Sequence, residues 1–339
     1  MAGWRMDDVI TQEHILTMLY RQRDLNFVPG AEHLYSNSGY ALLADLVSRF
    51  AGTLFSEFCQ REIFDRISTS TTHVHDVHQR IVLNRAYSYD DVDNVYEIRV
   101  LSFANCGTTS LFTSVEDLAT WMIHLQEQRA SGDPALKRLT EREALNDEVE
   151  NAYGFGLTAR EWRGSDAIQH SGSDAGFRSH LLMIPEHGFG VAVLCSVPCG
   201  PQRLAFEVAD HCLADHLDPA EEEKSNNQGH QSETQPDPLA EDVMSQYLGE
   251  YESQELQTRY WLLMKGGHLR VRHQRHRDME MTCLGIDRFK GSQRFLNAIR
   301  FTRNNGQIDG FLADGGDRVR SLRFEKVEGR RENTTGEHA

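Results

Sequence analysis

The stretch Leu34-Tyr35-Ser36-Asn37-Ser38-Gly39-Tyr40 leads into the most clearly periodic segment of this 339-residue chain. Apolar residues recur after it at the spacing of one helical face, namely Leu43, Leu46, Val47 and Phe50. Gly52 follows the last of them, as is typical of a helix C-terminus. We therefore predict a helix over Tyr40–Ala51 that buries this apolar stripe.

Tyr35 and Asn37 lie on the short loop that enters this helix, so their side chains, two positions apart, can point into one cleft. A tyrosine there can carry protons if its pKa is lowered, and an amide can hold a substrate. The alternative is a capped helix start in which the Tyr-x-Asn pattern arises by chance.

A second stretch, His170-Ser171-Gly172-Ser173-Asp174-Ala175-Gly176-Phe177, precedes two apolar runs, Ser179–Ile184 and Phe189–Ser196. The turn residues between the runs predict a hairpin. The glycines of the second stretch allow a close approach to the backbone. We therefore expect an edge strand that opens with His-Ser-Gly and along which a substrate can lie.

Together, the Tyr-Ser-Asn-x-Gly-Tyr and His-x-Gly-x-x-x-Gly-Phe patterns resemble the serine β-lactamase and penicillin-binding-protein superfamily. The chain is most similar to the class C-like, β-lactamase-related branch of esterases and D-amino-acid peptidases. The resemblance extends over most of residues 1–217, including Gly107–Leu125 and Tyr153–Leu157. It implies an α/β (α+β) fold, in which helices cover an antiparallel sheet, and hydrolysis of an ester, peptide or β-lactam through an acyl-enzyme.

The resemblance also implies roles for individual residues. Tyr35 would shuttle protons, Asn37 would hold the amide of the substrate, and His170 would orient the substrate or assist the tyrosine.

The strand that follows His170 would bind the substrate through Ser171, Gly172 and Ser173. The backbone amide of Ser173 would form half of an oxyanion hole, whose other half is the amide of the nucleophile.

The nucleophile motif of this superfamily, Ser-x-x-Lys, is absent from the chain, since no serine has a lysine three residues later. We expect that the chain lacks the N-terminal part of the domain and is inactive as it stands. The alternative is a pseudoenzyme that keeps the cleft to bind peptide-like ligands.

A histidine cluster supports a third hypothesis. The segment His73-Val74-His75-Asp76-Val77-His78 resembles the metal-binding signature of metallo-β-lactamase-type hydrolases, although the order of its residues differs. His73 and His75 would share one face of a strand, but a metal site needs further ligands. We prefer an exposed, polar strand or loop here and predict no metal and no other cofactor.

Composition narrows the range of partners. A formal net charge of −16 argues against nucleic acid and anionic membranes. No apolar run is long enough to span a membrane, and the first residues do not resemble a signal peptide. We predict a soluble protein that takes a small-molecule or peptide-like substrate and that self-associates if part of its domain is missing. The compartment is left open, because a signal would be lost with a missing N-terminal part.

The pattern divides the chain into an incomplete hydrolase domain (1–217), a disordered polar linker (218–242), a β-barrel domain (243–327) and a disordered tail (328–339). Glycine- and asparagine-rich turns separate short strands in the third part, which resembles a lipocalin-like domain. Arg203–Leu217 is predicted to be a helix with Leu204, Val208 and Cys212 turned inward.

The six cysteines are expected to be reduced and mostly buried.

Overall fold

The computed structural model describes residues 1–5, 7–100, 102–141, 144–149, 151–219, 239–316 and 318–327. These residues form two compact units. Residues 7–17 and 28–219 form the sheet unit, and residues 1–5, 18–27 and 239–327 form the barrel unit. The predicted linker and tail lie almost entirely outside the described residues.

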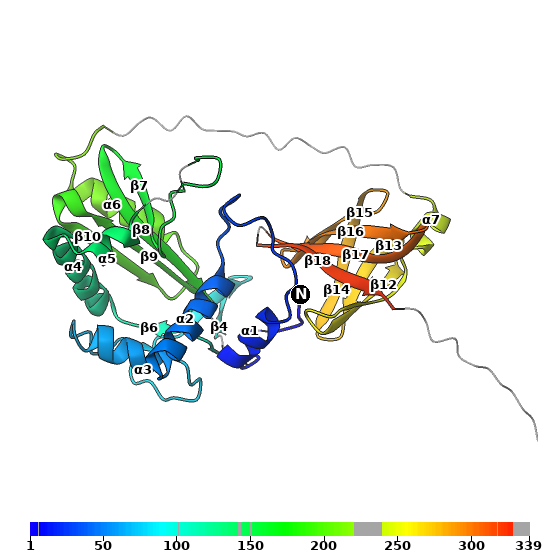
Figure 1. Cartoon of the computed structure of the whole chain (residues 1–339), viewed down its shortest axis with the longest axis horizontal. Coiled ribbons are helices and arrows are strands. Elements are labelled where there is room, and N and C mark those ends of the chain that lie inside the picture. The colour runs from blue at the N-terminus through cyan, green and yellow to red at the C-terminus, as the bar shows by residue number, and fades with distance from the viewer. Residues whose placement is uncertain are drawn as a thin grey trace, which may run out of the picture. The chain divides into compact units, whose positions relative to one another are not determined.

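The sheet unit is organised around a four-stranded antiparallel sheet with the strand order β10-β9-β8-β7. Its strands are β7 (Thr158–Trp162), β8 (Ser165–Asp174), β9 (Phe177–Ile184) and β10 (Phe189–Cys195). The hairpin predicted from the runs Ser179–Ile184 and Phe189–Ser196 corresponds to β9 and β10 of this sheet (Figure 1).

Helices cover both faces of this sheet. On one face, α6 (Pro201–Cys212) packs Ala205 and Ala209 against Leu182. On the other face, α4 (Val115–Ser131) packs Met122 against Ile168 and Met183. The two faces correspond to alternate residues along each strand, as the pleat requires. This arrangement confirms the predicted fold class.

A serine side chain caps the start of α4. The Ser114 side chain accepts a hydrogen bond from the backbone N–H of Asp117 and so caps the helix.

Shorter elements complete the sheet unit. They are β1 (Ile10–Thr11), α1 (Gln12–Leu19, which continues into the barrel unit), α2 (Asn37–Ala51), α3 (Phe55–Cys59), a π-helical turn (Gln60–Phe64), β2 (His73–Val74), the hairpin β3 (Ser88–Val92) and β4 (Val95–Arg99), β5 (Phe103–Ala104), β6 (Leu111–Phe112), α5 (Pro134–Leu139) and a 3-10 turn (Pro185–His187).

The α2 helix ends at Ala51 as predicted but begins at Asn37, so Asn37 lies in its first turn and not on the loop before it, and its buried face is a different one. Leu43, Leu46 and Phe50 are exposed, Phe50 to 90%. Ala41 and Ala44 are buried instead, because the loop at Gly107 approaches this side of the helix closely. The prediction that the large apolar stripe faces the core was therefore wrong.

The same error affects α6. Leu204, Val208 and Cys212 were predicted to face inward, yet all three are exposed. The small residues one position later, such as Ala205, pack against the sheet, because alanine lets the helix approach closely.

The cysteines differ in part from the prediction. Cys59 and Cys106 are buried free thiols, as expected. Cys195 and Cys199, however, form a disulfide where the chain bends between β10 and α6. The expectation that these two were reduced was wrong.

The barrel unit is a closed antiparallel barrel of eight strands, in which β18 pairs with β11 (Figure 1). A short helix, α7 (Glu241–Ser245), precedes it. Its strands are β11 (Gly249–Ser253), β12 (Thr258–Lys265), β13 (His268–His273), β14 (His276–Gly285), β15 (Arg288–Gln293), β16 (Leu296–Asn304), β17 (Gln307–Gly315) and β18 (Val319–Lys326).

Aromatic side chains fill the interior of this barrel. Phe311 stacks on Phe324 at 4.8 Å between ring centroids, and Tyr251 lies 5.0 Å from Phe311. The Tyr251 hydroxyl donates to the backbone carbonyl of Tyr247 at 2.9 Å, so its buried polar end is satisfied. An eight-stranded barrel is just wide enough to be filled in this way. The likeness to lipocalins stays a prediction.

A glycine substitution tests the close approach beneath α2. Gly107 has a φ of 89°, and a Cβ atom there would lie 2.3 Å from the backbone oxygen of Tyr40. We expect Gly107→Ala to lower the free energy of unfolding of the sheet unit by about 3 kcal/mol, through backbone strain and overpacking.

Gly132→Ala is the matched control. Gly132 has a φ of 79°, but no atom of the described residues lies within 4 Å of the added Cβ. We therefore expect the free energy of unfolding to fall by about 1 kcal/mol, from backbone strain alone. Urea denaturation measures both variants, and equal losses would contradict the packing argument.

Candidate active site

The cap of α2 fixes the Tyr35-Ser36-Asn37 segment. The Ser36 side chain accepts a hydrogen bond from the backbone N–H of Gly39 at 3.1 Å. Asn37 is the first residue of the helix and is exposed, whereas Tyr35 is half-buried. The two side chains predicted to act together therefore flank one rigid capping residue.

Tyr35 belongs to an aromatic cluster with Tyr153 and His170. The Tyr35 ring stands perpendicular to the Tyr153 ring at 5.9 Å between centroids, and it lies 6.1 Å from the His170 ring. The Tyr153 hydroxyl is 3.0 Å from His170 Nε2. The structure thus brings together Tyr35 and His170, which are 135 positions apart in sequence.

Sequence reasoning assigned no role to Tyr153. Its backbone N–H donates to the Asn151 side-chain oxygen at 3.1 Å, and the Asn151 amide donates to the Tyr153 carbonyl at 3.1 Å. These two bonds hold the loop before β7 in place. The available signal was that Tyr153 opens Tyr153–Leu157, a segment included in the family resemblance.

Burial favours the uncharged forms of His170 and Tyr153. It lowers the pKa of His170, which favours the neutral imidazole. Burial, aided by the neighbouring Tyr40 and Tyr35, raises the pKa of Tyr153 to about 12. The Tyr153 hydroxyl and His170 Nε2 therefore meet as two neutral groups that share a hydrogen bond.

The register of β8 exposes part of its backbone. A two-residue turn, Ala175-Gly176, joins β8 to β9, so Asp174 and Phe177 must be a hydrogen-bonded pair. Alternation then directs the N–H and C=O groups of Ser173 and Ser171 away from β9.

On that outer side, β7 pairs with β8 only as far as Gln169. No strand among the described residues continues this pairing over His170–Asp174. We call this segment the open edge of β8. The Ser173 N–H, expected to serve an oxyanion hole, therefore points out of the sheet at this edge.

The predicted site residues of β8 divide between its two faces. His170 and Gly172 lie on the face of Ile168, whereas Ser171 and Ser173 lie on the other. The Ser171 hydroxyl is 2.8 Å from Nδ1 of His180. A Cβ at Gly172 would meet the Ser179 hydroxyl at 2.2 Å, so a side chain there needs Ser179 to move.

The histidine cluster departs from the exposed strand that we predicted. His75 is 3% exposed and stacks on Phe112 at 4.3 Å between centroids. His73 Nε2 lies 3.4 Å from His75 Nδ1. No group of three or more histidine, cysteine or acidic side chains in the described part of the chain is arranged to hold a metal ion.

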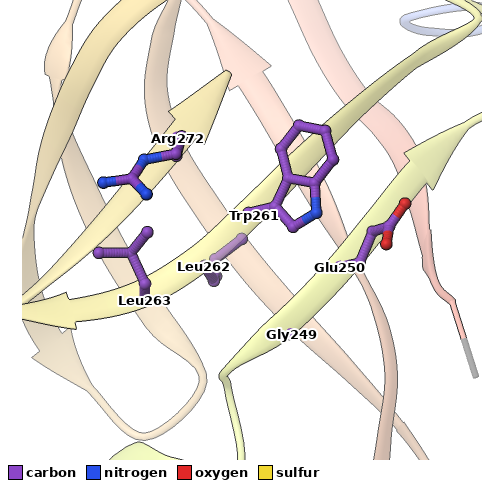
Figure 2. Close-up of a pocket in the computed structure, with 6 residues that line it drawn as sticks. All are labelled: Gly249, Glu250, Trp261, Leu262, Leu263 and Arg272. Atoms are coloured by element: carbon purple, nitrogen blue, oxygen red, sulfur yellow. The ribbon is translucent and has the colours of Figure 1, made fainter. Parts of the chain in front are cut away.

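A hollow of about 530 Å³ lies on the barrel unit rather than at the aromatic cluster. Figure 2 shows Trp261 and Arg272 on its neighbouring strands, together with Glu250. The two charged groups already have partners, since Arg259 binds Glu250 at 2.7 Å and Arg272 binds Asp278 at 2.9 Å. Because its two charged groups are engaged in ion pairs and no serine, cysteine, histidine or tyrosine is among its lining residues, we do not assign this hollow as the active site.

Comparisons with known proteins identify the family of the chain. The sequence profile described as Beta-lactamase matches residues 3–206. A D-aminopeptidase from Gluconobacter oxydans (strain 621H) is 26% identical over 207 residues, which are 61% of this chain and 39% of that protein. The chain thus spans well under half of the length of this curated relative.

Solved structures show the same fold. An octameric penicillin-binding protein homologue from Pyrococcus abyssi superimposes with a TM-score of 0.53 at 18% identity, over 95% of this chain and 71% of its own. The D-amino acid amidase from Ochrobactrum anthropi SV3, complexed with D-phenylalanine, gives 0.51 at 21% identity, over 63% of this chain and 67% of its own. No described helix has the length and apolar character needed to cross a membrane.

The burial of His170 can be tested by NMR titration. We expect a midpoint below the ordinary value of 6.5, because burial disfavours the imidazolium. Tyr35→Ala should move the midpoint up towards 6.5, since it admits water to the ring. Tyr96→Ala removes an exposed tyrosine from β4 and should leave the midpoint unchanged. A midpoint above 6.5 in the unaltered chain would contradict our account.

Proposed function

Because the chain belongs to the Beta-lactamase family of serine hydrolases, we propose that it carries the proton-transfer and substrate-binding part of an acyl-transfer site. The observation that carries this proposal is the Tyr153–His170 hydrogen bond beside Tyr35. His170 lies on the strand whose open edge has no strand partner among the described residues. Such a combination suits an acyl group that lies along the strand while its carbonyl becomes an oxyanion.

Each residue has a proposed role. Tyr35 exchanges a proton with the attacking and leaving groups, and the neutral His170, held by Tyr153, orients or assists it. Asn37 holds the amide of the substrate. Ser171, Gly172 and Ser173 line the substrate, and the Ser173 N–H supplies one oxyanion donor.

The proposed substrates are amides or peptides of D-amino acids. The 26% identity to a D-aminopeptidase supports this class, and so does the fold shared with a D-amino acid amidase that was solved with D-phenylalanine. Esters and β-lactams use the same acyl-enzyme chemistry, so they belong in the same assay.

The chain alone is proposed to bind such substrates without cleaving them. No Ser-x-x-Lys occurs in its sequence, so the proton-transfer groups have no nucleophile to activate. A non-catalytic binding protein is therefore the second candidate function.

Acylation tests the proposal. We expect no covalent adduct with a fluorescent penicillin and no hydrolysis of D-phenylalanine amide by the present chain. An N-terminal extension that supplies a Ser-x-x-Lys helix should restore both. Tyr35→Phe should then lower kcat about 10²- to 10⁴-fold, the usual worth of a positioned proton carrier. Tyr96→Phe, on the exposed β4, should leave kcat unchanged.

Two results would overturn this assignment. Turnover by the present chain that is lost with a chelator would point to His73 and His75. Turnover that survives the chelator and falls with Tyr35→Phe would mean that the chain holds another nucleophile.

We also propose that the chain self-associates through α2. Leu43, Leu46 and Phe50 leave an exposed apolar stripe on this helix, and such a stripe favours association. The octameric state of the Pyrococcus abyssi homologue is compatible with this proposal.

Light scattering after gel filtration measures the association. We expect a mass above that of one chain, and Phe50→Glu should reduce it because the charge opposes burial of the stripe. Leu83→Glu, at another exposed apolar residue, is the control and should have no effect. A monomer at high protein concentration would contradict the proposal.

A further inference from the structure

His180 and Ser171 form a cross-strand pair on the face of β8 opposite His170. The register pairs these two residues directly, between the hydrogen-bonded pairs His170–Leu181 and Gly172–Ser179. Side chains of a non-hydrogen-bonded pair lie closest together in an antiparallel sheet. This explains why the Ser171 hydroxyl reaches Nδ1 of His180 at 2.8 Å.

The surroundings of His180 determine where its proton lies. The residue is 2% exposed, and its ring lies 6.0 Å from that of Phe206 on α6. Burial, with a smaller contribution from His170, lowers the pKa of His180, so the imidazole holds one proton at neutral pH. Nε2 is buried and has no hydrogen-bond partner in the described part of the chain.

A proton on Nε2 would therefore be a buried donor without an acceptor, which is rarer in proteins than an unpaired acceptor. On Nδ1, the same proton is donated to the Ser171 oxygen. The Nδ1 tautomer is consequently the favoured one.

This tautomer determines the direction in which the Ser171 hydroxyl hydrogen points. With its oxygen accepting from His180, the hydroxyl hydrogen turns away from the imidazole. Ser171 is exposed, and its backbone already faces the open edge of β8.

We propose that His180 is a positioning residue that makes the Ser171 hydroxyl a hydrogen-bond donor at the open edge of β8, where it binds an acceptor oxygen of the substrate. The inference rests on the proposed function, since it takes the open edge as the place where a D-amino-acid substrate lies. It adds a specificity: the site prefers a carbonyl or carboxylate at Ser171 to an ammonium group.

The tautomer is tested without any substrate. Long-range proton–nitrogen NMR correlation on the full chain with ¹⁵N-labelled histidine distinguishes a protonated Nδ1 from a protonated Nε2, and His180→Asn assigns the signal. We expect the proton on Nδ1. A proton on Nε2, or a mixture of the two tautomers, overturns the inference.

Binding tests the consequence for the ligand. D-phenylalanine, which carries an acceptor carboxylate, is titrated calorimetrically against the chain and its variants. His180→Leu removes the donor and should weaken binding about 5- to 10-fold, the usual worth of one hydrogen bond. His180→Asn keeps an amide N–H near the position of Nδ1 and should stay within about 2-fold of the unaltered chain.

Ser171→Ala should weaken binding of D-phenylalanine as much as His180→Leu does. The double variant should lose no more affinity than either single variant, because the two residues act through one hydrogen bond. If the unaltered chain binds and His180→Leu binds equally well, the inference fails while the proposed function stands. If the unaltered chain does not bind D-phenylalanine, the proposed substrate class fails, and the tautomer measurement still decides the role of His180. Should His180→Leu not fold, Ser171→Ala and His180→Asn give the same decision.

Discussion

The two-residue turn between β8 and β9 determines which residues of β8 hydrogen-bond to β9 and which direct their backbone groups outward. The candidate site is built on this strand. A longer turn would allow another register, but Asp174 and Phe177 can pair across Ala175-Gly176 in one way only. The turn is itself held from outside. The Gly176 N–H donates to the Ser88 hydroxyl at 3.0 Å, and a Cβ at Gly176 would lie 2.3 Å from the backbone oxygen of Tyr89. The β3 strand thus holds the turn in place. This turn determines which backbone amides of β8 point away from β9, those of Ser171 and Ser173, and which points toward it, that of Gly172. It also determines the face of the sheet on which His170 lies.

Burial then sets the protonation states around that strand. Two histidines lie on its opposite faces, and low solvent access lowers the pKa of both. Each neutral ring has a hydroxyl as a partner: Nε2 of His170 meets the phenol of Tyr153, and Nδ1 of His180 meets the hydroxyl of Ser171. Because the partners differ, the two rings have different proposed parts: His170 belongs to the proton-transfer cluster, and His180 orients a serine.

Sequence patterns predicted the fold more fully than they predicted the packing. Capping and turn chemistry is local, so the Ser114 cap, the C-terminal end of α2 and the β9–β10 hairpin could be inferred from neighbouring residues. Which side of a helix is buried depends on what lies opposite. In α2 and α6 the large residues Leu46 and Val208 point outward, while alanines allow close contact.

The candidate site was predicted in part for a similar reason. Tyr35 and His170 belong to motifs with recognisable spacing, and the structure places their rings together. Tyr153 and His180 carry no comparable signal, because their importance comes from strand register and from loops that meet in space. The disulfide between Cys195 and Cys199 was missed because it depends on a bend that no local pattern specified.

The two units also differ in how they would misassemble. The barrel pairs its last strand with its first, so each of its described strands has two neighbours. No described strand of the barrel is therefore an open edge to which another chain could add. The sheet unit keeps such a template along His170–Asp174, among the strands that the structure describes. An extended peptide substrate could pair with this edge through a ladder of backbone hydrogen bonds. An unfolded segment of another chain could form the same ladder and so start an aggregate. An edge that suits an extended ligand therefore also suits aggregation, and the exposed polar side chains of Ser171 and Ser173 make this edge less apolar.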